Sequence, residues 1–126
     1  MAVTAALTGT LTLTDGSTNI TQMAKVLSGL SLAGTVGDVR QLSIGTGATA
    51  VTLPVASVHL LYIKNTHATQ TLQVTWTPAN GASAVILTLR PGSAILFVEA
   101  STGQGITALS LLGSGASTTC ELVLAG

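Results

Sequence analysis

The chain has 126 residues, enough for one domain with a hydrophobic core, and 47% of them are hydrophobic. Only 6% are Asp, Glu, Lys or Arg, and the four basic and four acidic residues cancel. This balance excludes the basic footprint of a nucleic-acid-binding protein and the polybasic patch that binds an anionic membrane. So few charges also protect a monomer poorly from association, which favours a chain that buries surface against copies of itself or another protein.

The N-terminal part contains one clear strand signal followed by an irregular segment. Within residues 1–14, apolar residues alternate with threonine, the period-2 pattern of a strand, and an Asp-Gly-Ser turn follows at residues 15–17. From Ile20 to Leu27 the apolar residues fit one face of a helix, but an irregular strand followed by a loop fits them too. We therefore expect a strand or arm over residues 1–14 and an irregular segment or short helix over residues 18–37.

The rest of the chain is a succession of short strands and turns. Runs of aliphatic and β-branched residues are separated by turn signals about every 8–12 residues, which is typical of an all-β sandwich or barrel. The predicted strands cover residues 39–44, 49–53, 58–64, 71–77, 84–89, 94–98, 106–112 and 119–124. We expect residues 1–126 to form a single antiparallel β-sandwich of eight or nine short strands.

Residues 84–98 form the most apolar stretch of the chain. Pro91 and Gly92 suit the two central positions of a type II turn, which requires a positive φ at the second. The runs on either side are nearly continuous in apolar residues, whereas a strand with one solvated face would alternate. We expect a hairpin covered on both faces, by the core on one side and by a second sheet or a neighbouring subunit on the other.

Few residues are suited to chemistry. His59 and His67 have no acidic residue beside them, and a metal site needs several converging ligands. Cys120, the only cysteine, fits a small buried residue of the last strand. The aromatic residues fall on three different predicted strands, where we expect core packing: Tyr62, Trp76 and Phe97. We expect no catalytic residue, no metal, no cofactor and no enzymatic activity.

The last third of the chain carries a family resemblance. A Leu-Arg-Pro-Gly-Ser turn at residues 89–93 precedes the strand at 106–111, and residues 116–119 lead into residues 121–126. With the low charge and the abundant Thr, Gly and Ala, this resembles the small jelly-roll cement or decoration proteins on the capsids of tailed bacteriophages. The resemblance implies a jelly-roll fold, synthesis in a host cytoplasm, a virion location and a role in stabilising the shell between capsomers.

The resemblance also implies partners and contact residues. It implies a homo-oligomer, with a trimer favoured, that binds the major capsid protein or another virion protein, and neither nucleic acid nor membrane. The residues expected at subunit or capsid contacts are Leu60, Tyr62, Ile95, Leu96 and Phe97. A phage tail, neck or fibre component is one alternative, and a glycan-binding β-sandwich module is an alternative of another class. The N-terminal strand is a candidate for exchange between subunits, where it would cover an open sheet edge.

Overall fold

The computed structural model describes residues 3–6, 13–15, 18–20, 31–34, 37–99 and 104–126, and these residues form twelve β-strands. In chain order the strands are β1 (Val3–Ala6), β2 (Leu13–Asp15), β3 (Thr18–Ile20), β4 (Ser31–Gly34), β5 (Gly37–Ile44), β6 (Thr49–Val51), β7 (Leu60–Asn65), β8 (Leu72–Pro78), β9 (Val85–Leu89), β10 (Ala94–Val98), β11 (Ile106–Gly113) and β12 (Thr118–Ala125). Within the described residues there is no helix long and apolar enough to cross a membrane.

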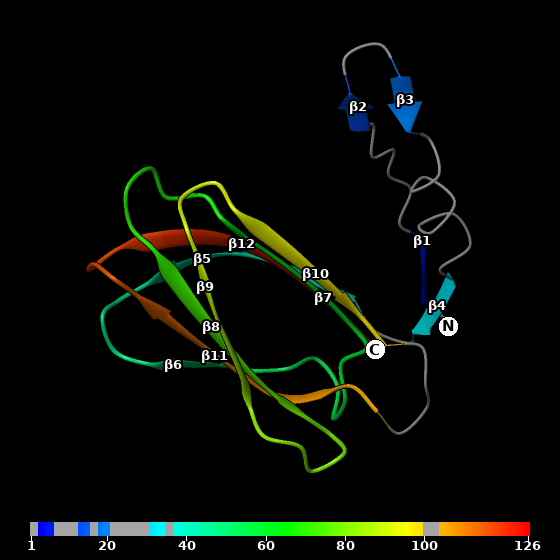
Figure 1. Cartoon of the computed structure of the whole chain (residues 1–126). Helices are drawn as coiled ribbons and strands as arrows, with labels where there is room; N and C mark the ends of the chain where they lie inside the picture. The colour runs from blue at the N-terminus through cyan, green and yellow to red at the C-terminus, as the bar shows by residue number, and fades with distance from the viewer. Residues whose placement is uncertain (1–2, 7–12, 16–17, 21–30, 35–36, 100–103) are drawn as a thin grey trace.

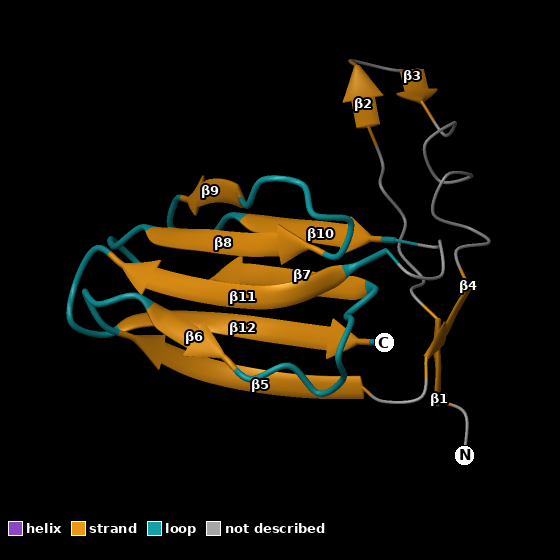
Figure 2. Ribbon diagram, turned by 90° about the horizontal axis from the view of Figure 1, so that it is seen from below, coloured by secondary structure: helices purple, strands orange, loops and turns teal. Residues whose placement is uncertain are grey.

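Strands β5 to β12 make two four-stranded antiparallel sheets (Figure 1). The first sheet has the order β10-β7-β12-β5, and the second sheet has the order β6-β11-β8-β9. Figure 2 shows the two sheets as separate layers, with β9, β8, β11 and β6 following one another in one of them. The predicted all-β sandwich is confirmed, and each strand predicted from residue 39 onward has a counterpart within two residues of its expected ends.

The pairing of these strands is nested. The antiparallel partners are β5 with β12, β6 with β11, β7 with β10, and β8 with β9. In the series from β5 to β12, the first strand thus pairs with the last, the second with the second-last, and so on to the middle. Pairing of β7 with β12 and of β8 with β11 then joins these ribbons side by side into the two sheets. One long hairpin rolled up in this way is the jelly-roll arrangement, which confirms the expected fold class.

The core lies between the two sheets and is almost entirely aliphatic. Successive side chains of a strand point to opposite faces, so each strand contributes every second residue. The fully buried large side chains include Leu61 and Ile63 of β7, Leu72 and Val74 of β8, and Leu111 of β11. Burying each such side chain stabilises the fold by roughly 1.5–3 kcal/mol before conformational entropy is counted. Leu72 and Val74, which alternate with polar residues in the sequence, therefore both point into the core.

The N-terminal part forms two short antiparallel ribbons. Strand β1 pairs with β4, with Val3 opposite Gly34, and β2 pairs with β3, with Asp15 opposite Thr18. The predicted strand over residues 1–14 corresponds to β1 and the start of β2, while residues 7–12 lie outside the described part. The predicted helical face falls mostly on residues 21–30, which also lie outside it, but residues 18–20 and 31–34 are strands.

The prediction of a hairpin over residues 84–98 is wrong, because its two strands do not pair with each other, although the predicted turn between them is confirmed. Gly92 has a φ of 77°, and the amide of Ser93 donates to the carbonyl of Arg90 over 3.0 Å. Yet β9 pairs with β8, and β10 pairs with β7 in the other sheet. A type II turn splays its flanking strands, and here the Gly92 amide donates to the carbonyl of Asn65 of β7. The turn therefore carries the chain from the second sheet to the first. Strands β11 and β12, although consecutive in the chain, likewise lie in different sheets.

Candidate functional site: exposed apolar surfaces

An apolar row crosses the outer face of the first sheet. We call it the outer row, and it consists of Leu96, Tyr62, Val123 and Val39. The strand register places these residues directly opposite one another in that order across β10, β7, β12 and β5. Val39 is 78% exposed and Leu96 is 38% exposed, while Tyr62 and Val123 are half-buried. The outer face therefore presents hydrophobic surface from one edge of the sheet to the other.

The five residues predicted at contacts divide between the two faces of the first sheet. Tyr62 and Leu96 are neighbours in the outer row. Leu60 is two residues before Tyr62 in β7 and so points to the same face, but it is only 6% exposed. Ile95 and Phe97 point to the opposite face and pack against the core. Period-2 alternation separates Leu96 from the residues on either side of it. That these residues make intermolecular contacts stays a prediction. Tyr62, expected in the core, lies on the outer face instead.

A second exposed apolar surface is strand β9. The exposed large hydrophobic side chains of the described residues are Val39, Val85, Ile86, Leu87 and Leu96, so three of them are consecutive on β9. Within a single chain the core covers the inner face of β9 only in part and Ile86 stays exposed on the outer face, while the expected cover by a neighbouring subunit stays a prediction. The sequence pattern missed this because a continuous apolar run does not show whether the cover comes from the same chain.

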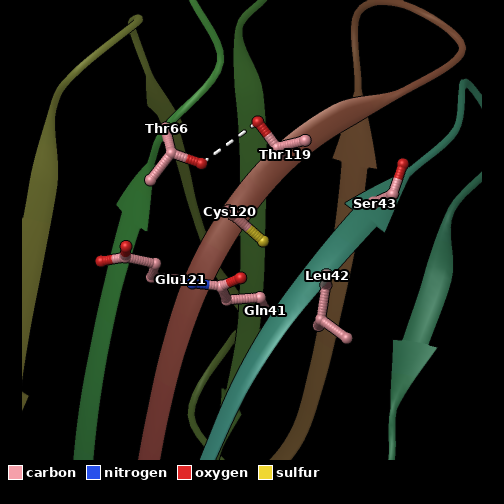
Figure 3. Close-up of a pocket in the computed structure, with 7 residues that line it drawn as sticks. All are labelled: Gln41, Leu42, Ser43, Thr66, Thr119, Cys120 and Glu121. Atoms are coloured by element: carbon pink, nitrogen blue, oxygen red, sulfur yellow. Dashed lines mark hydrogen bonds between the residues drawn. The ribbon is translucent and has the colours of Figure 1, made fainter.

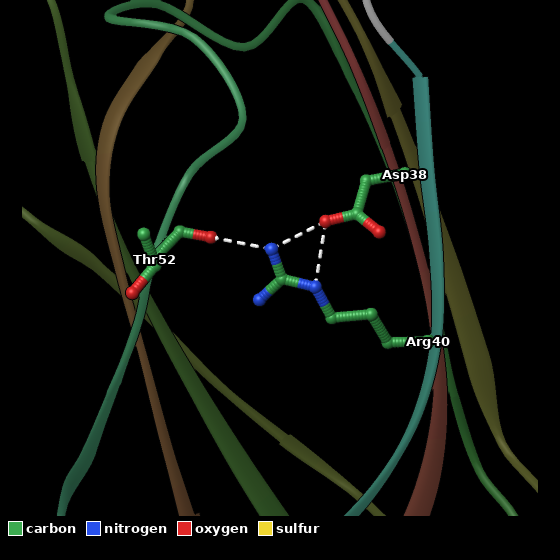
Figure 4. A network of polar contacts seen from close by, with 3 residues as sticks. All are labelled: Asp38, Arg40 and Thr52. Carbon is green, nitrogen blue, oxygen red and sulfur yellow. Dashed lines mark hydrogen bonds and ion pairs between the residues drawn. The ribbon is translucent and has the colours of Figure 1, made fainter.

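The two open sides of the sandwich differ in chemistry. At the side formed by β5 and β6, the Nε of Arg40 donates to Oδ2 of Asp38 over 2.6 Å, and Nη2 of Arg40 also contacts this carboxylate. The same Nη2 donates to the carbonyl of Thr52, just after β6, over 2.9 Å (Figure 4). Arg40 thus links the edge of the first sheet to the edge of the second through polar contacts.

The side formed by β9 and β10 is apolar and partly open. The rings of Trp76 and Phe97 lie 6.0 Å apart at 50°, joining β8 of the second sheet to β10 of the first. Val85 and Leu87 point to the inner side, since they stand opposite Trp76 and Val74, yet they remain 40% and 38% exposed. No charged residue occurs between Lys64 and Arg90, which spans all of β8 and β9.

A shallow polar groove lies on the first sheet, beside the outer row. It has a volume of about 450 Å³ and is lined by Gln41, Leu42, Ser43, Thr66, Thr119, Cys120 and Glu121 (Figure 3). The hydroxyl of Thr66 donates to that of Thr119 over 3.1 Å. Glu121 stands opposite Gln41 on one side and Lys64 on the other. The groove offers hydroxyl, amide and carboxylate groups, the set that binds polyols.

The residues considered for chemistry have structural surroundings. His59 precedes β7 and His67 follows it. Nδ1 of His59 lies 3.2 Å from the carbonyl oxygen of Glu99, while Nδ1 of His67 accepts hydrogen bonds from the amides of its own turn. Cys120 is buried, as predicted, and desolvation raises the pKa of its thiol to about 11 despite a backbone hydrogen bond at Leu42. Among the described residues, no group of three or more His, Cys, Asp or Glu is placed to hold a metal ion.

Comparison with known proteins finds a solved structure with a similar fold but no family to which the chain can be assigned. No family model matches the chain, and no curated protein matches it. Among solved structures, it is similar to a protein of Bacillus endospore appendages, described as a novel family of disulfide-linked pili. The TM-score is 0.54 at 17% sequence identity, over 71% of this chain and 83% of that chain. At this identity the likeness concerns the fold alone.

Proposed function

We propose that this protein is a non-enzymatic structural subunit that works by assembling with copies of itself and with a larger protein structure. The observation that carries the proposal is the distribution of exposed hydrophobic side chains. They lie along a sheet edge and across a sheet face, where another protein can cover them. The similarity to a pilus protein of Bacillus endospore appendages supports the same general role.

The assembly proposed here is non-covalent. The similar appendage protein belongs to disulfide-linked pili, but this chain has a single cysteine. Cys120 is buried in β12, and its raised pKa keeps the thiol protonated at neutral pH, whereas the thiolate is the reactive form. Hydrophobic contact and strand pairing are therefore the interactions that we expect between copies.

The solution mass of the purified protein tests this role. Size-exclusion chromatography with light scattering, run from about 1 μM to 1 mM, should give a stable mass above that of the 12.5 kDa chain. A monomer over the whole range would overturn the proposal of self-assembly. The Val39→Asp and Gln41→Asp variants form a matched pair, because both side chains are exposed on the same face of β5. If the outer row is a contact surface, only the first should reduce the mass.

The finer role that we propose is that of a virion decoration protein, binding between capsomers of a phage shell. The resemblance of the last third of the chain, the confirmed jelly roll and the low charge support it. Antibody labelling of particles from the source of the protein tests this role by electron microscopy. Label on the shell would support the decoration role, label on a tail or neck would favour the alternative, and particles without label would overturn a virion location.

A glycan-binding module is the second candidate function, and the polar groove of Gln41, Ser43, Thr119 and Glu121 favours it. Titration with a panel of oligosaccharides should then shift the side-chain amide resonances of Gln41. Fluorescence of Trp76 is a poor reporter for this groove, because the indole packs against Phe97 and the core. A panel that leaves the Gln41 resonances unchanged would eliminate this candidate.

A further inference from the structure

Strand β9 lacks the features that usually protect an edge strand. It lies at the end of the second sheet, and four of its five residues are exposed. Alternate residues of an antiparallel edge strand direct their N–H and C=O groups away from the sheet. Ile86 is 62% exposed on the outer side, while Val85 and Leu87 are exposed on the inner side. The strand has no proline, glycine or charge within it.

The other three edges are better protected. Strand β5 carries Asp38 and Arg40 on its inner face, and their polar contacts reach the residue after β6. Strand β6 has only three residues and is followed by Pro54. Strand β10 has one exposed large hydrophobic side chain, Leu96, and Glu99 follows its end. Charged residues, short length and nearby proline are the means by which natural sheets prevent pairing at an edge, so β9 is the edge best suited to accept another strand.

A second copy of this chain is the occupant that the sequence around β9 favours. No charged residue lies between Lys64 and Arg90, so two copies of this edge approach each other without repulsion between like charges. A highly charged partner would find no complementary group there. The N-terminal strand of another copy is the competing donor, but in its own chain β1 is already paired with β4.

We propose that β9 pairs antiparallel with β9 of a second copy about a twofold axis at Ile86, so that the second sheets of the two copies become continuous. In this register Ile86 faces Ile86 of the second copy, and Val85 faces Leu87 of the second copy. The three exposed side chains of each β9 are then matched with one another. This inference rests on the proposed self-assembly and names its contact. A pair formed in this way closes on itself, so the trimer implied by the family resemblance would need another surface.

Cysteine cross-linking tests the register directly. Directly opposite residues of an antiparallel pair have Cβ atoms about 4.5–5.5 Å apart, close enough for a disulfide after a small shift. We expect the Ile86→Cys variant to form a disulfide-linked dimer on mild oxidation. Thr46→Cys, at an exposed position in the turn after β5 and outside both apolar surfaces, measures collisional cross-linking and should react at least about tenfold more slowly. Because Cys120 is buried and its thiol stays protonated, the unmodified protein should form few disulfide-linked dimers and gives a low background.

A mixture of variants identifies the pairing without relying on the symmetry axis. Val85→Cys mixed with Leu87→Cys should give a cross-linked dimer, whereas either variant alone should cross-link no faster than Thr46→Cys. Failure of the mixture to cross-link faster than this control would overturn the proposed register. Equal rates for Ile86→Cys and Thr46→Cys would overturn the pairing of β9 altogether.

Mass measurement separates this inference from the proposed function. An oligomer without the Ile86 cross-link would overturn the β9 contact and leave self-assembly standing, whereas a monomer at all concentrations would overturn both. Ile86→Asp should raise the dimer dissociation constant on the order of 10²-fold, because two carboxylates would face each other in a desolvated contact. Its circular dichroism should match that of the unmodified protein, since the side chain is 62% exposed in the monomer.

Discussion

Asn65 organises one end of the sandwich, although its side chain is fully buried. Its Nδ2 donates to the carbonyls of Gln70 and Leu89 over 2.8 and 3.1 Å, and its Oδ1 accepts from the amide of His67 over 3.0 Å. Its backbone also exchanges hydrogen bonds with Ser93 and the adjacent glycine of the β9–β10 turn. One residue thus joins the β7–β8 turn to the β9–β10 turn. From the sequence, Asn65 is simply the first residue after the strand predicted over residues 58–64. Its role could not be predicted, because hydrogen bonds to distant backbone groups leave no local pattern.

Replacing Asn65 should be costly for stability. The Asn65→Leu variant leaves three backbone groups without a partner in a buried place, so we expect the free energy of unfolding to fall by about 3 kcal/mol. Asn80→Ala is the matched control, because Asn80 is exposed and accepts one hydrogen bond, from the amide of Ala82. Its expected cost is below about 1 kcal/mol. Urea denaturation measures both variants, and equal costs would contradict the role assigned to Asn65.

The buried thiol of Cys120 should make stability depend on pH in the alkaline range. Desolvation raises its pKa to about 11 in the folded state, above the unfolded value of 9.0. The folded protein therefore keeps a proton that the unfolded chain releases, and stability falls as the pH rises from about 9 to 11. The full loss is on the order of 2 kcal/mol. Urea midpoints at pH 8 and 10.5 should differ less in a Cys120→Ala variant, and an identical difference would contradict this linkage.

At the scale of the element, short-range patterns predicted strands but not their partners. The boundaries of β8 follow from alternation, and those of β10 from its apolar run and the turn residues before it, all of which are local. The assignment of β9 and β10 to different sheets depends on hydrogen bonds that the turn at residues 90–93 makes with Asn65, far away in the sequence. For the same reason, a continuous apolar run could not show that β9 is exposed at an edge while β10 lies against the core.

Adjacent residues of β10 should separate folding from assembly. Ile95 packs against the core, so Ile95→Asp buries a charge and should unfold the protein or lower its stability by more than about 3 kcal/mol. Leu96 is 38% exposed in the outer row, so Leu96→Asp should leave the fold intact and weaken association through this face. Thermal unfolding and light scattering measure the two effects. Unfolding of Leu96→Asp would show that this face supports the fold of the single chain.

At the scale of the whole molecule, the low charge and the jelly roll are connected. Rolling one long hairpin into two sheets covers the inner faces but leaves two open sides, and a polar link through Arg40 joins the sheets at one of them. At the other side, Val85 and Leu87 of β9 remain partly exposed although they point to the inner face. A protein selected to remain monomeric would be expected to place lysine or glutamate there. Their absence from β8 and β9 is what connects the composition to the proposed assembly role.

Association should therefore respond to salt as a hydrophobic contact does. Surface charge pairs weaken when the Debye length falls from about 10 Å at 0.1 M to 3 Å at 1 M ionic strength, whereas apolar contacts do not depend on this screening. We expect the oligomer to keep its mass, measured by light scattering, between 0.1 and 1 M sodium chloride, and sodium sulfate to tighten association. Dissociation in sodium chloride would instead assign the contact to charged groups such as Lys64 and Glu121, which stand opposite each other across β7 and β12. The variants Lys64→Gln and Glu121→Gln would then weaken assembly, whereas a hydrophobic contact at β9 predicts that both assemble as the unmodified protein does.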